Sequence, residues 1–157
     1  MNFNSGLKSS KTDKWETPQA LFDQLDAEFR FNLDACADET NHKCPLYFDR
    51  AQDGLAQSWA GYRVWCNPPY GRAVGDWVKK AYLETRDGVL GTVCVMLVAS
   101  RTDTQWWHEY AMKATEIRFI SGRVKFGDSQ NGAPFPSAVL VFGTPRMPTI
   151  STMEVKL

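Results

Sequence analysis

The chain has 157 residues, of which 43% are hydrophobic and 23% charged, a composition that predicts a single globular domain with one core. Its 18 basic and 18 acidic side chains leave a formal net charge of zero. This excludes binding to nucleic acid through bulk positive charge and leaves only a local basic patch. No stretch approaches the roughly 18 apolar residues of a membrane span, and the polar start predicts no secretory signal, so we expect a cytoplasmic protein that binds no membrane.

The first third of the chain predicts a tail, a helix and a short strand. Residues 1–13 are polar and small and are expected to be a flexible tail, with residues 14–157 as one domain. Thr17 is suited to be a helix N-cap and Pro18 the first helical residue. Apolar residues at helical spacing continue this helix to residue 29. Residues 31–34 alternate as in a strand that ends on Asp34. A weak strand or turn is expected at 46–48.

The remaining chain alternates between strand and helix patterns. Strands are predicted at 62–66, 92–98, 116–120, 123–126 and 137–142, and helices at 73–86 and 103–113. The run 92–98 is continuously apolar, as in a central strand that is buried on both faces. We therefore predict an α/β fold with a largely parallel sheet and a β-rich C-terminal part.

Cysteine and histidine spacing raises the question of a metal site. Cys36, His42 and Cys44 lie close in sequence, but no CxxC pair or second arm accompanies them. Small, buried, reduced cysteines are the favoured interpretation, and we expect no metal. Neither His42 nor His108 is assigned a catalytic role.

The tetrapeptide Asn67-Pro68-Pro69-Tyr70 follows a predicted strand and precedes a predicted helix, where open α/β sheets bind ligands. The amide oxygen of Asn67 is an acceptor, and the two prolines fix the direction of the Pro68 carbonyl. Together with the flat ring of Tyr70, they suit a planar substrate that carries an NH₂ group. Two acceptors favour the pyramidal amine that can attack a methyl group. The same residues could also form only a rigid turn.

Further segments bring a family resemblance. The chain resembles the phage-type DNA N6-adenine methyltransferases over most of residues 14–143. The resemblance rests on KWETPQALFDQL, FNLDACAD, VWCNPPYGR, SRTDTQWWHE, GRVKF at 122–126 and SAVLVF at 137–142. It implies S-adenosylmethionine as methyl donor and a flipped adenine held by Asn67, Pro68 and Tyr70. A full methyltransferase sheet would place two more strands between Asp34 and Asn67. This interval is short, so we expect a trimmed Rossmann-like sheet.

Several residues are then candidates for holding the donor. The resemblance implies contacts from the helix opening at Trp15, Thr17 and Pro18, where a helix N-terminus attracts a carboxylate. Asp34 could accept from the donor's ammonium group, while Asn67 also borders the donor. The small residues Ala35 and Cys36 permit close approach, although the Gly-rich loop of many methyltransferases is absent. Asp53 is a candidate for the adenosine end, and equally for an ordinary turn before Gly54.

Contacts with double-stranded DNA must come from local cations. The candidates are Arg72, Arg101, Arg123 and Lys125, with Lys8, Lys11 and Lys14 in the tail. Loop 127–136 is polar and could read bases. Because no segment is long enough for a recognition domain, we expect a short or relaxed recognition sequence. The oligomeric state is open between a monomer and a weak dimer.

Two other classes of function stay open at this point. The first is transfer to another conjugated amino group, in cytosine N4, an RNA base or a protein glutamine. The second is a non-catalytic nucleic-acid-binding module with the same fold. The WETP opening and the Trp-rich segment favour adenine in DNA, in a bacterial or phage-infected cell. Both Trp106 and Trp107 are expected in the core rather than against a base.

Overall fold

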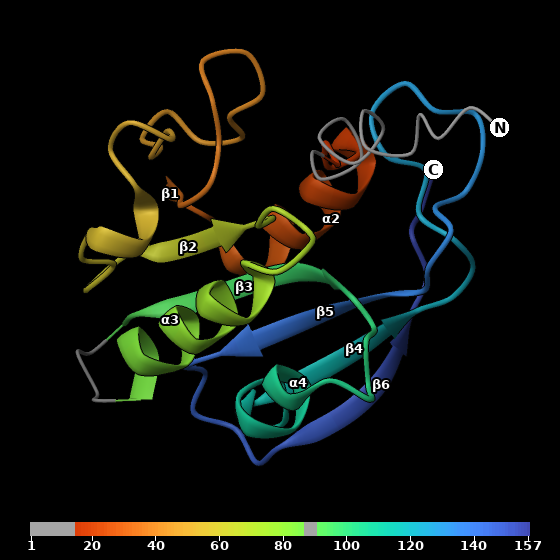
Figure 1. Ribbon diagram of the computed structural model, residues 1–157. Helices are drawn as coiled ribbons and strands as arrows, with labels where there is room; N and C mark the ends of the chain where they lie inside the picture. Colours follow the sequence, from red (N-terminus) through yellow and green to blue (C-terminus); the bar gives the residue numbers. More distant parts are fainter. Residues whose placement is uncertain (1–14, 87–90) are drawn as a thin grey trace, which may run out of the picture.

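A computed structural model describes residues 15–86 and 91–157 and contains a six-stranded sheet between helices (Figure 1). The helices are α2 (Gln19–Phe29), α3 (Val74–Arg86) and α4 (Gln105–Glu109), with 3₁₀ turns η1 (Gly54–Ala56) and η2 (Ala111–Lys113). The strands are β1 (Leu33–Asp34), β2 (Arg63–Cys66), β3 (Val93–Ala99), β4 (Glu116–Ile120), β5 (Ser137–Phe142) and β6 (Thr149–Met153). The expected tail, residues 1–13, and Lys14 lie outside the described residues.

The order of the strands is β1-β2-β3-β5-β4-β6. Strands β1, β2 and β3 are mutually parallel, β5 is antiparallel to both of its neighbours, and β6 is parallel to β4. All strands except β5 therefore run in one direction, and their carboxyl ends meet at one edge of the sheet. We call this edge, with the segments that follow these strands, the carboxyl edge.

Alternate side chains of β3 belong to two hydrophobic cores, one on each face of the sheet. Met96 and Val98 pack on the face that α3 and α4 cover, whereas Val95 and Leu97 pack on the α2 face. Figure 1 shows α3 and α4 in front of the sheet and α2 behind it. Full burial of such a side chain contributes roughly 1.5–3 kcal/mol, so packing on both faces stabilises the central strand. This rigid sheet positions the segments at the carboxyl edge.

The expected α/β fold and the trimmed sheet are confirmed. Between β1 and β2 the chain forms no full strand, only turn η1 and a single bridge from Tyr47 to Asp34. The sheet is less parallel than expected, because β5 runs against both neighbours.

Two element predictions were wrong in detail, and one strand was not predicted. Residues 123–126 form no strand: Val124 and Phe126 are buried, which imitates strand alternation, but the Val124 carbonyl accepts from Ala133 within a loop. The helix expected at 103–113 stops at Glu109 and resumes as η2. Strand β6 was not expected, because four of its five residues are exposed and its sequence, TISTM, carries little hydrophobic signal.

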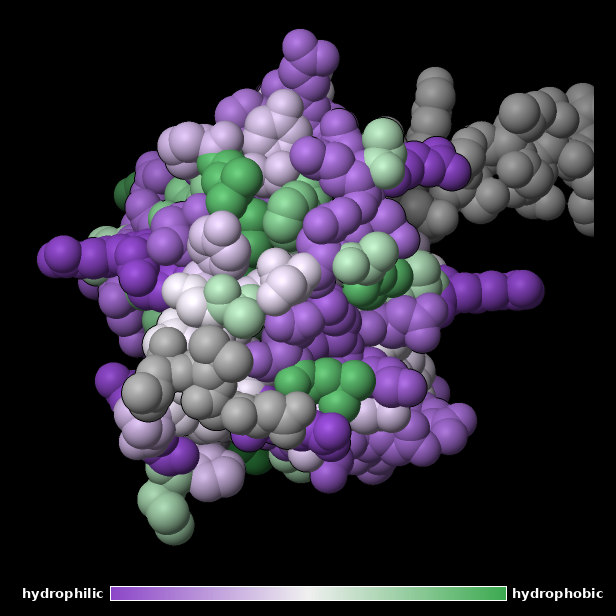
Figure 2. Space-filling view, turned by 90° about the vertical axis from the view of Figure 1, so that its left-hand side faces the viewer, coloured by the Kyte–Doolittle hydropathy of each residue, from purple (hydrophilic) through white to green (hydrophobic). Residues whose placement is uncertain are grey.

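The surface is mixed, as in most globular proteins. The face drawn in Figure 2 is mainly hydrophilic, with hydrophobic residues in small separate areas, an ordinary surface composition. Within residues 15–86 and 91–157, no helix has the length and apolar character needed to cross a membrane.

Candidate active site

The carboxyl edge brings together residues that are distant in sequence. Asp34 ends β1, Asn67 follows β2 directly, Arg101 comes two residues after β3, and Arg123 follows β4. Because these four strands are parallel, the residues after them emerge at the same edge. The chain thus collects its candidate site residues where α/β proteins bind ligands.

The side chain of Asn67 is held in one orientation. Its amide nitrogen donates to the Trp15 carbonyl oxygen and, at 2.9 Å, to the Thr17 hydroxyl. A carbonyl oxygen can only accept, so the nitrogen must face Trp15 and the amide oxygen must face away. Among the described side chains, Asn67 Oδ1 is one of the few buried polar atoms without a hydrogen-bond partner. Such an acceptor normally requires a partner.

Thr17 does not cap the helix, contrary to expectation. Helix α2 begins at Gln19, with Pro18 as its N-cap, and the Pro18 carbonyl accepts from Phe22. The Thr17 hydroxyl is buried and accepts from Asn67 instead. The expected opening Trp15-Thr17-Pro18 therefore lies directly against the NPPY segment, because Asn67 is hydrogen-bonded to both Trp15 and Thr17.

Tyr70 lies between the NPPY segment and an aromatic cluster. Its ring is almost fully buried, and its hydroxyl donates to the Leu97 carbonyl at 3.0 Å. The rings of Phe126 and Phe135 meet it edge-on, with centroids 5.9 Å and 5.4 Å away. Burial raises the pKa of the Tyr70 phenol well above its ordinary value, so the hydroxyl stays protonated and Tyr70 is suited to stacking rather than to acid–base chemistry. Pro68 is buried and Pro69 half-buried beside it.

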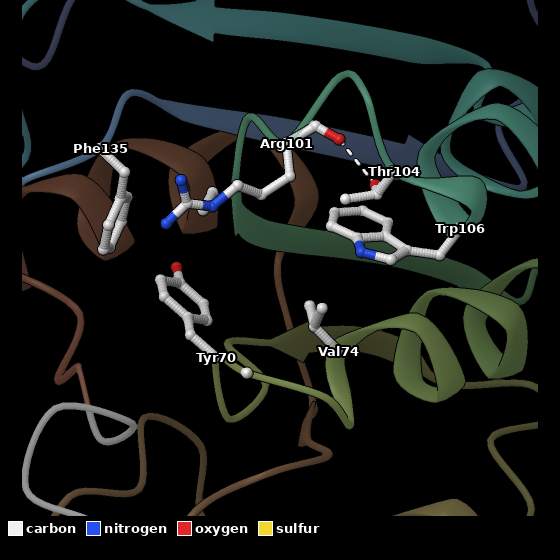
Figure 3. A pocket seen from close by; sticks show the side chains of 8 residues that line it. Tyr70, Val74, Arg101, Thr104, Trp106 and Phe135 are labelled. Carbon is white, nitrogen blue, oxygen red and sulfur yellow. Dashed lines mark hydrogen bonds between the residues drawn. The ribbon is translucent and has the colours of Figure 1, made fainter. Parts of the chain in front are cut away.

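A cavity of about 260 Å³ opens beside Tyr70 (Figure 3). Its lining residues are Tyr70, Gly71, Val74, Ala99, Arg101, Thr104, Trp106 and Phe135. It is smaller than the roughly 300–1,000 Å³ of pockets for drug-sized ligands, which suits one planar base. Asn67 is not part of the lining, since its amide oxygen is covered.

Sequence reasoning missed two walls of this cavity, Trp106 and Phe135. Trp107 is buried in the core as expected, but Trp106 is only half-buried and faces the cavity. The available signal was the position of the QWW helix directly after β3 at the carboxyl edge. Phe135 lies in loop 127–136, which the sequence predicted as a polar loop that could read bases, so its aromatic ring was not considered.

Asp34 is a buried carboxylate at the end of β1. Its oxygens accept from the backbone nitrogens of Lys43, at 2.9 Å, and Cys36, at 3.3 Å. Burial raises the pKa of Asp34 to about 6, although these two hydrogen bonds oppose the shift. A carboxylate has about four lone-pair positions, so the oxygens retain capacity for a further donor.

The other expected donor residues converge beside Asp34. Gly54 lies so close to Ala35 that a Cβ atom at Gly54 would be 2.1 Å from the Ala35 carbonyl oxygen. Asp53 has a positive φ of 53° and accepts from Leu55 at 3.1 Å. Cys36 is half-buried, and burial raises its thiol pKa to about 12, so it is a neutral thiol. The structure brings Ala35, Cys36 and Asp53 into one region.

The expected DNA-contacting cations lie at the same edge. Arg72, Arg101, Arg123 and Lys125 are all exposed. They come from the segments after β2, β3 and β4. Arg101 lines the cavity beside Tyr70, whereas Arg123 and Lys125 line a second pocket with Pro18 and Leu21.

Comparison with known proteins decides the family. The family model for DNA N-6-adenine-methyltransferase (Dam) matches residues 4–152. A DNA N-6-adenine-methyltransferase of Haemophilus phage HP1 is 30% identical over 135 residues, which cover 84% of this chain and 76% of that protein. One of Escherichia phage T1 is 31% identical over 110 residues, 69% of this chain but 44% of that protein. The chain belongs to the DNA N-6-adenine-methyltransferase family.

Membership of this methyltransferase family confirms the resemblance seen in the sequence and makes the chain an adenine methyltransferase that acts on DNA. It also favours adenine over the other conjugated amino groups, and an enzyme over a non-catalytic module. Across the two described stretches, no group of three or more histidines, cysteines or acidic residues is placed to hold a metal. His42 instead donates to the Cys44 carbonyl and stacks on Tyr47.

Proposed function

We propose that this chain transfers a methyl group from S-adenosylmethionine to the N6 atom of an adenine that has been turned out of double-stranded DNA. The observation that carries the proposal is the amide oxygen of Asn67, which is buried, unpartnered and fixed in direction by Trp15 and Thr17. An exocyclic NH₂ group is the partner that this oxygen lacks. Since the oxygen is covered, entry of the base must uncover it.

Asn67 would act on the reactivity of the amine. The N6 lone pair of adenine is delocalised into the ring and is a poor nucleophile. When Asn67 Oδ1 accepts one N6 proton, and the Pro68 carbonyl the other, the nitrogen is drawn toward the pyramidal geometry of the transition state. Preorganised dipoles of this kind contribute about 3–4 kcal/mol per group. S-adenosylmethionine would supply an electrophilic methyl group: the N6–methyl bond forms as the sulfur–methyl bond breaks, S-adenosylhomocysteine is the leaving group, and the extra N6 proton passes to solvent after the transfer.

The base would lie in the cavity beside Tyr70. Its face could stack on the Tyr70 ring, with Trp106 as a further wall. Stacking contributes about 1–3 kcal/mol per base, comparable with the few kcal/mol that base flipping costs. The aromatic lining of the cavity therefore supports an unpaired base as ligand.

The residues around Asp34 fit the donor. Among the described residues its carboxylate forms no ion pair, and burial raises its pKa to about 6; the donor's ammonium group would be an ion-pair partner. Ala35, Cys36 and Asp53 would border the adenosine part. Trp15, Thr17 and Pro18 would contact the methionine end beside Asn67.

The duplex would lie across the carboxyl edge. Arg72, Arg101, Arg123 and Lys125 would contact phosphates, which fix register without reading sequence. Loop 127–136 is the candidate for base reading, with residues 127–132 exposed. So short a reading surface supports a short or relaxed recognition sequence.

The deciding experiment is methyl transfer from labelled S-adenosylmethionine to unmethylated duplex DNA, followed by nucleoside analysis. Label in N6-methyladenine, mapped by sequencing to a short site, is the expected result. Label in another nucleoside would overturn the assignment of adenine as the target base. Transfer only to single-stranded DNA would overturn the assignment of double-stranded DNA as the substrate. A long, strict recognition sequence would contradict the proposed mode of reading.

A further inference from the structure

Arg101 has a backbone held by hydrogen bonds and a side chain that lies over an aromatic ring. Its backbone nitrogen donates to the Ala99 carbonyl at 2.8 Å, and its carbonyl accepts from the Thr104 hydroxyl at 2.6 Å and the Thr104 backbone nitrogen at 3.1 Å. Thr104 in turn caps α4 by accepting from Trp107. The Cα atom of Arg101 is therefore anchored between the end of β3 and the start of α4.

The guanidinium group of Arg101 lies at the cavity, against Phe135. Its central carbon is 5.5 Å from the Phe135 ring centroid. Figure 3 shows the group extended toward Phe135 above the hydroxyl of Tyr70, with Trp106 on the other side. In the described part of the chain, Arg101 forms no ion pair. A planar cation thus forms part of the wall of the cavity that the proposed function gives to a flipped base.

The contact that holds this guanidinium is a weak one. The Phe135 ring itself is buried, but the cation over it is exposed, and such a contact stabilises the cation much less than hydrogen bonds to phosphate do. Arg101 is exposed, so its long side chain can rotate about its anchored backbone without breaking other contacts. A base that enters the cavity brings its own flanking phosphates to the rim where Arg101 begins.

We propose that Arg101 exchanges partners during base capture: it leaves Phe135 as the adenine enters the cavity and pairs with a backbone phosphate beside the turned-out nucleotide. This inference rests on the proposed function. It distinguishes Arg101 from an ordinary phosphate contact, because the new pair forms only in the extrahelical state. Arg101 is thus a positioning residue that stabilises the turned-out base.

The test compares Arg101→Gln with wild type on two duplexes built around a mapped methylation site. In one, the target adenine is paired with thymine; in the other, it faces an abasic position and is already unpaired. Arg101→Gln is expected to lower kcat/KM about ten-fold or more on the paired duplex, the loss of one charge-assisted contact. On the abasic duplex the loss should be less than about three-fold, and Arg101→Lys should recover part of the activity by keeping the charge.

A second readout follows the base itself. With 2-aminopurine at the target position, wild type should raise the fluorescence of the duplex and Arg101→Gln should raise it less. Arg86→Gln is the matched control, since Arg86 also lies over an aromatic ring, Tyr82, but at the end of α3; it should behave as wild type. If Arg101→Gln lost equal activity on both duplexes, or gave the same fluorescence as wild type, the inference would be overturned while the proposed function stayed intact. No methylation of duplex DNA by wild type would instead overturn the proposed function.

Discussion

The side-chain nitrogen of Asn67 donates to the Thr17 hydroxyl at 2.9 Å, across fifty positions of sequence. This bond joins the segment before α2 to the segment after β2, and with the Trp15 carbonyl it uses both donor hydrogens of the amide. The amide oxygen is left as an acceptor of fixed direction. The orientation of the proposed acceptor is thus set by residues far from the NPPY tetrapeptide.

Replacing Thr17 by Val should therefore impair transfer without removing the acceptor. Valine preserves the shape of threonine but cannot accept from Asn67, so the amide can rotate and its nitrogen loses a partner. We expect kcat to fall about ten-fold, with a smaller change in KM, because a misdirected acceptor acts mainly in the transition state. Thr17→Ser keeps the hydroxyl and should recover most of kcat. An equal fall for both variants would contradict this positioning role.

Asn67→Ala removes the acceptor itself. We expect kcat to fall about 10²–10³-fold, the usual effect of losing one preorganised group, while calorimetric binding of S-adenosylmethionine changes by less than about three-fold. The matched control is Asn32→Ala, which removes an amide at the other end of β2, where it accepts from Arg63. A near-normal rate in Asn67→Ala would show that the orphaned oxygen has another purpose.

Much of this architecture follows from local sequence signals. Strands β2, β3, β4 and β5 and helix α3 carry clear local signals, such as the continuously apolar run of β3 and the helical spacing of α3, and the NPPY segment was placed correctly at the end of a strand. The order of the strands could not be derived in this way, because pairing of β5 between β3 and β4 depends on packing of the whole sheet. For the same reason β6, with its exposed TISTM sequence, gave no signal.

The site was harder to predict than the fold. Thr17 matched the pattern of an N-cap, and only the folded chain brings its hydroxyl to Asn67. Phe135 and Trp106 come from segments on opposite sides of the cavity, so no spacing in sequence reveals that they face it. Long-range contacts of this kind depend on the strand order, which local patterns do not contain.

The buried carboxyl of Asp34 should make stability depend on pH. Burial raises its pKa from 3.8 to about 6. Between these two pH values the native state therefore holds a proton on Asp34 that the unfolded chain has lost. The resulting stabilisation is present below pH 4 and is lost as the pH rises through 6, a change of about 3 kcal/mol. The free energy of unfolding of Asp34→Asn, relative to wild type, should therefore rise by this amount between pH 4 and pH 7 in urea titrations.

The same titration predicts how the donor binds. If the ammonium group of S-adenosylmethionine pairs with ionised Asp34, binding must ionise the carboxyl below pH 6. The affinity should then fall up to about ten-fold per pH unit below 6 and stay level above it. Calorimetry at pH 5 and pH 7 measures this directly. A flat profile would mean that Asp34 only organises the backbone of Cys36 and Lys43.

Arg118 should be the most sensitive charged residue outside the site. It donates to Glu116 at 2.9 Å and, through both terminal nitrogens, to Glu28 at 2.7 Å, and thereby fastens α2 to β4. These bonds, Glu28 first, raise the Arg118 pKa, while Arg118 lowers that of Glu28. Arg118→Met leaves Glu116 buried with only the exposed Arg146 as partner, and should cost about 3 kcal/mol of unfolding free energy. Glu28→Gln, at a side chain that is 40% exposed, should cost about 1 kcal/mol or less. Equal losses in urea unfolding would mean that burial of Glu116 has no part in the effect.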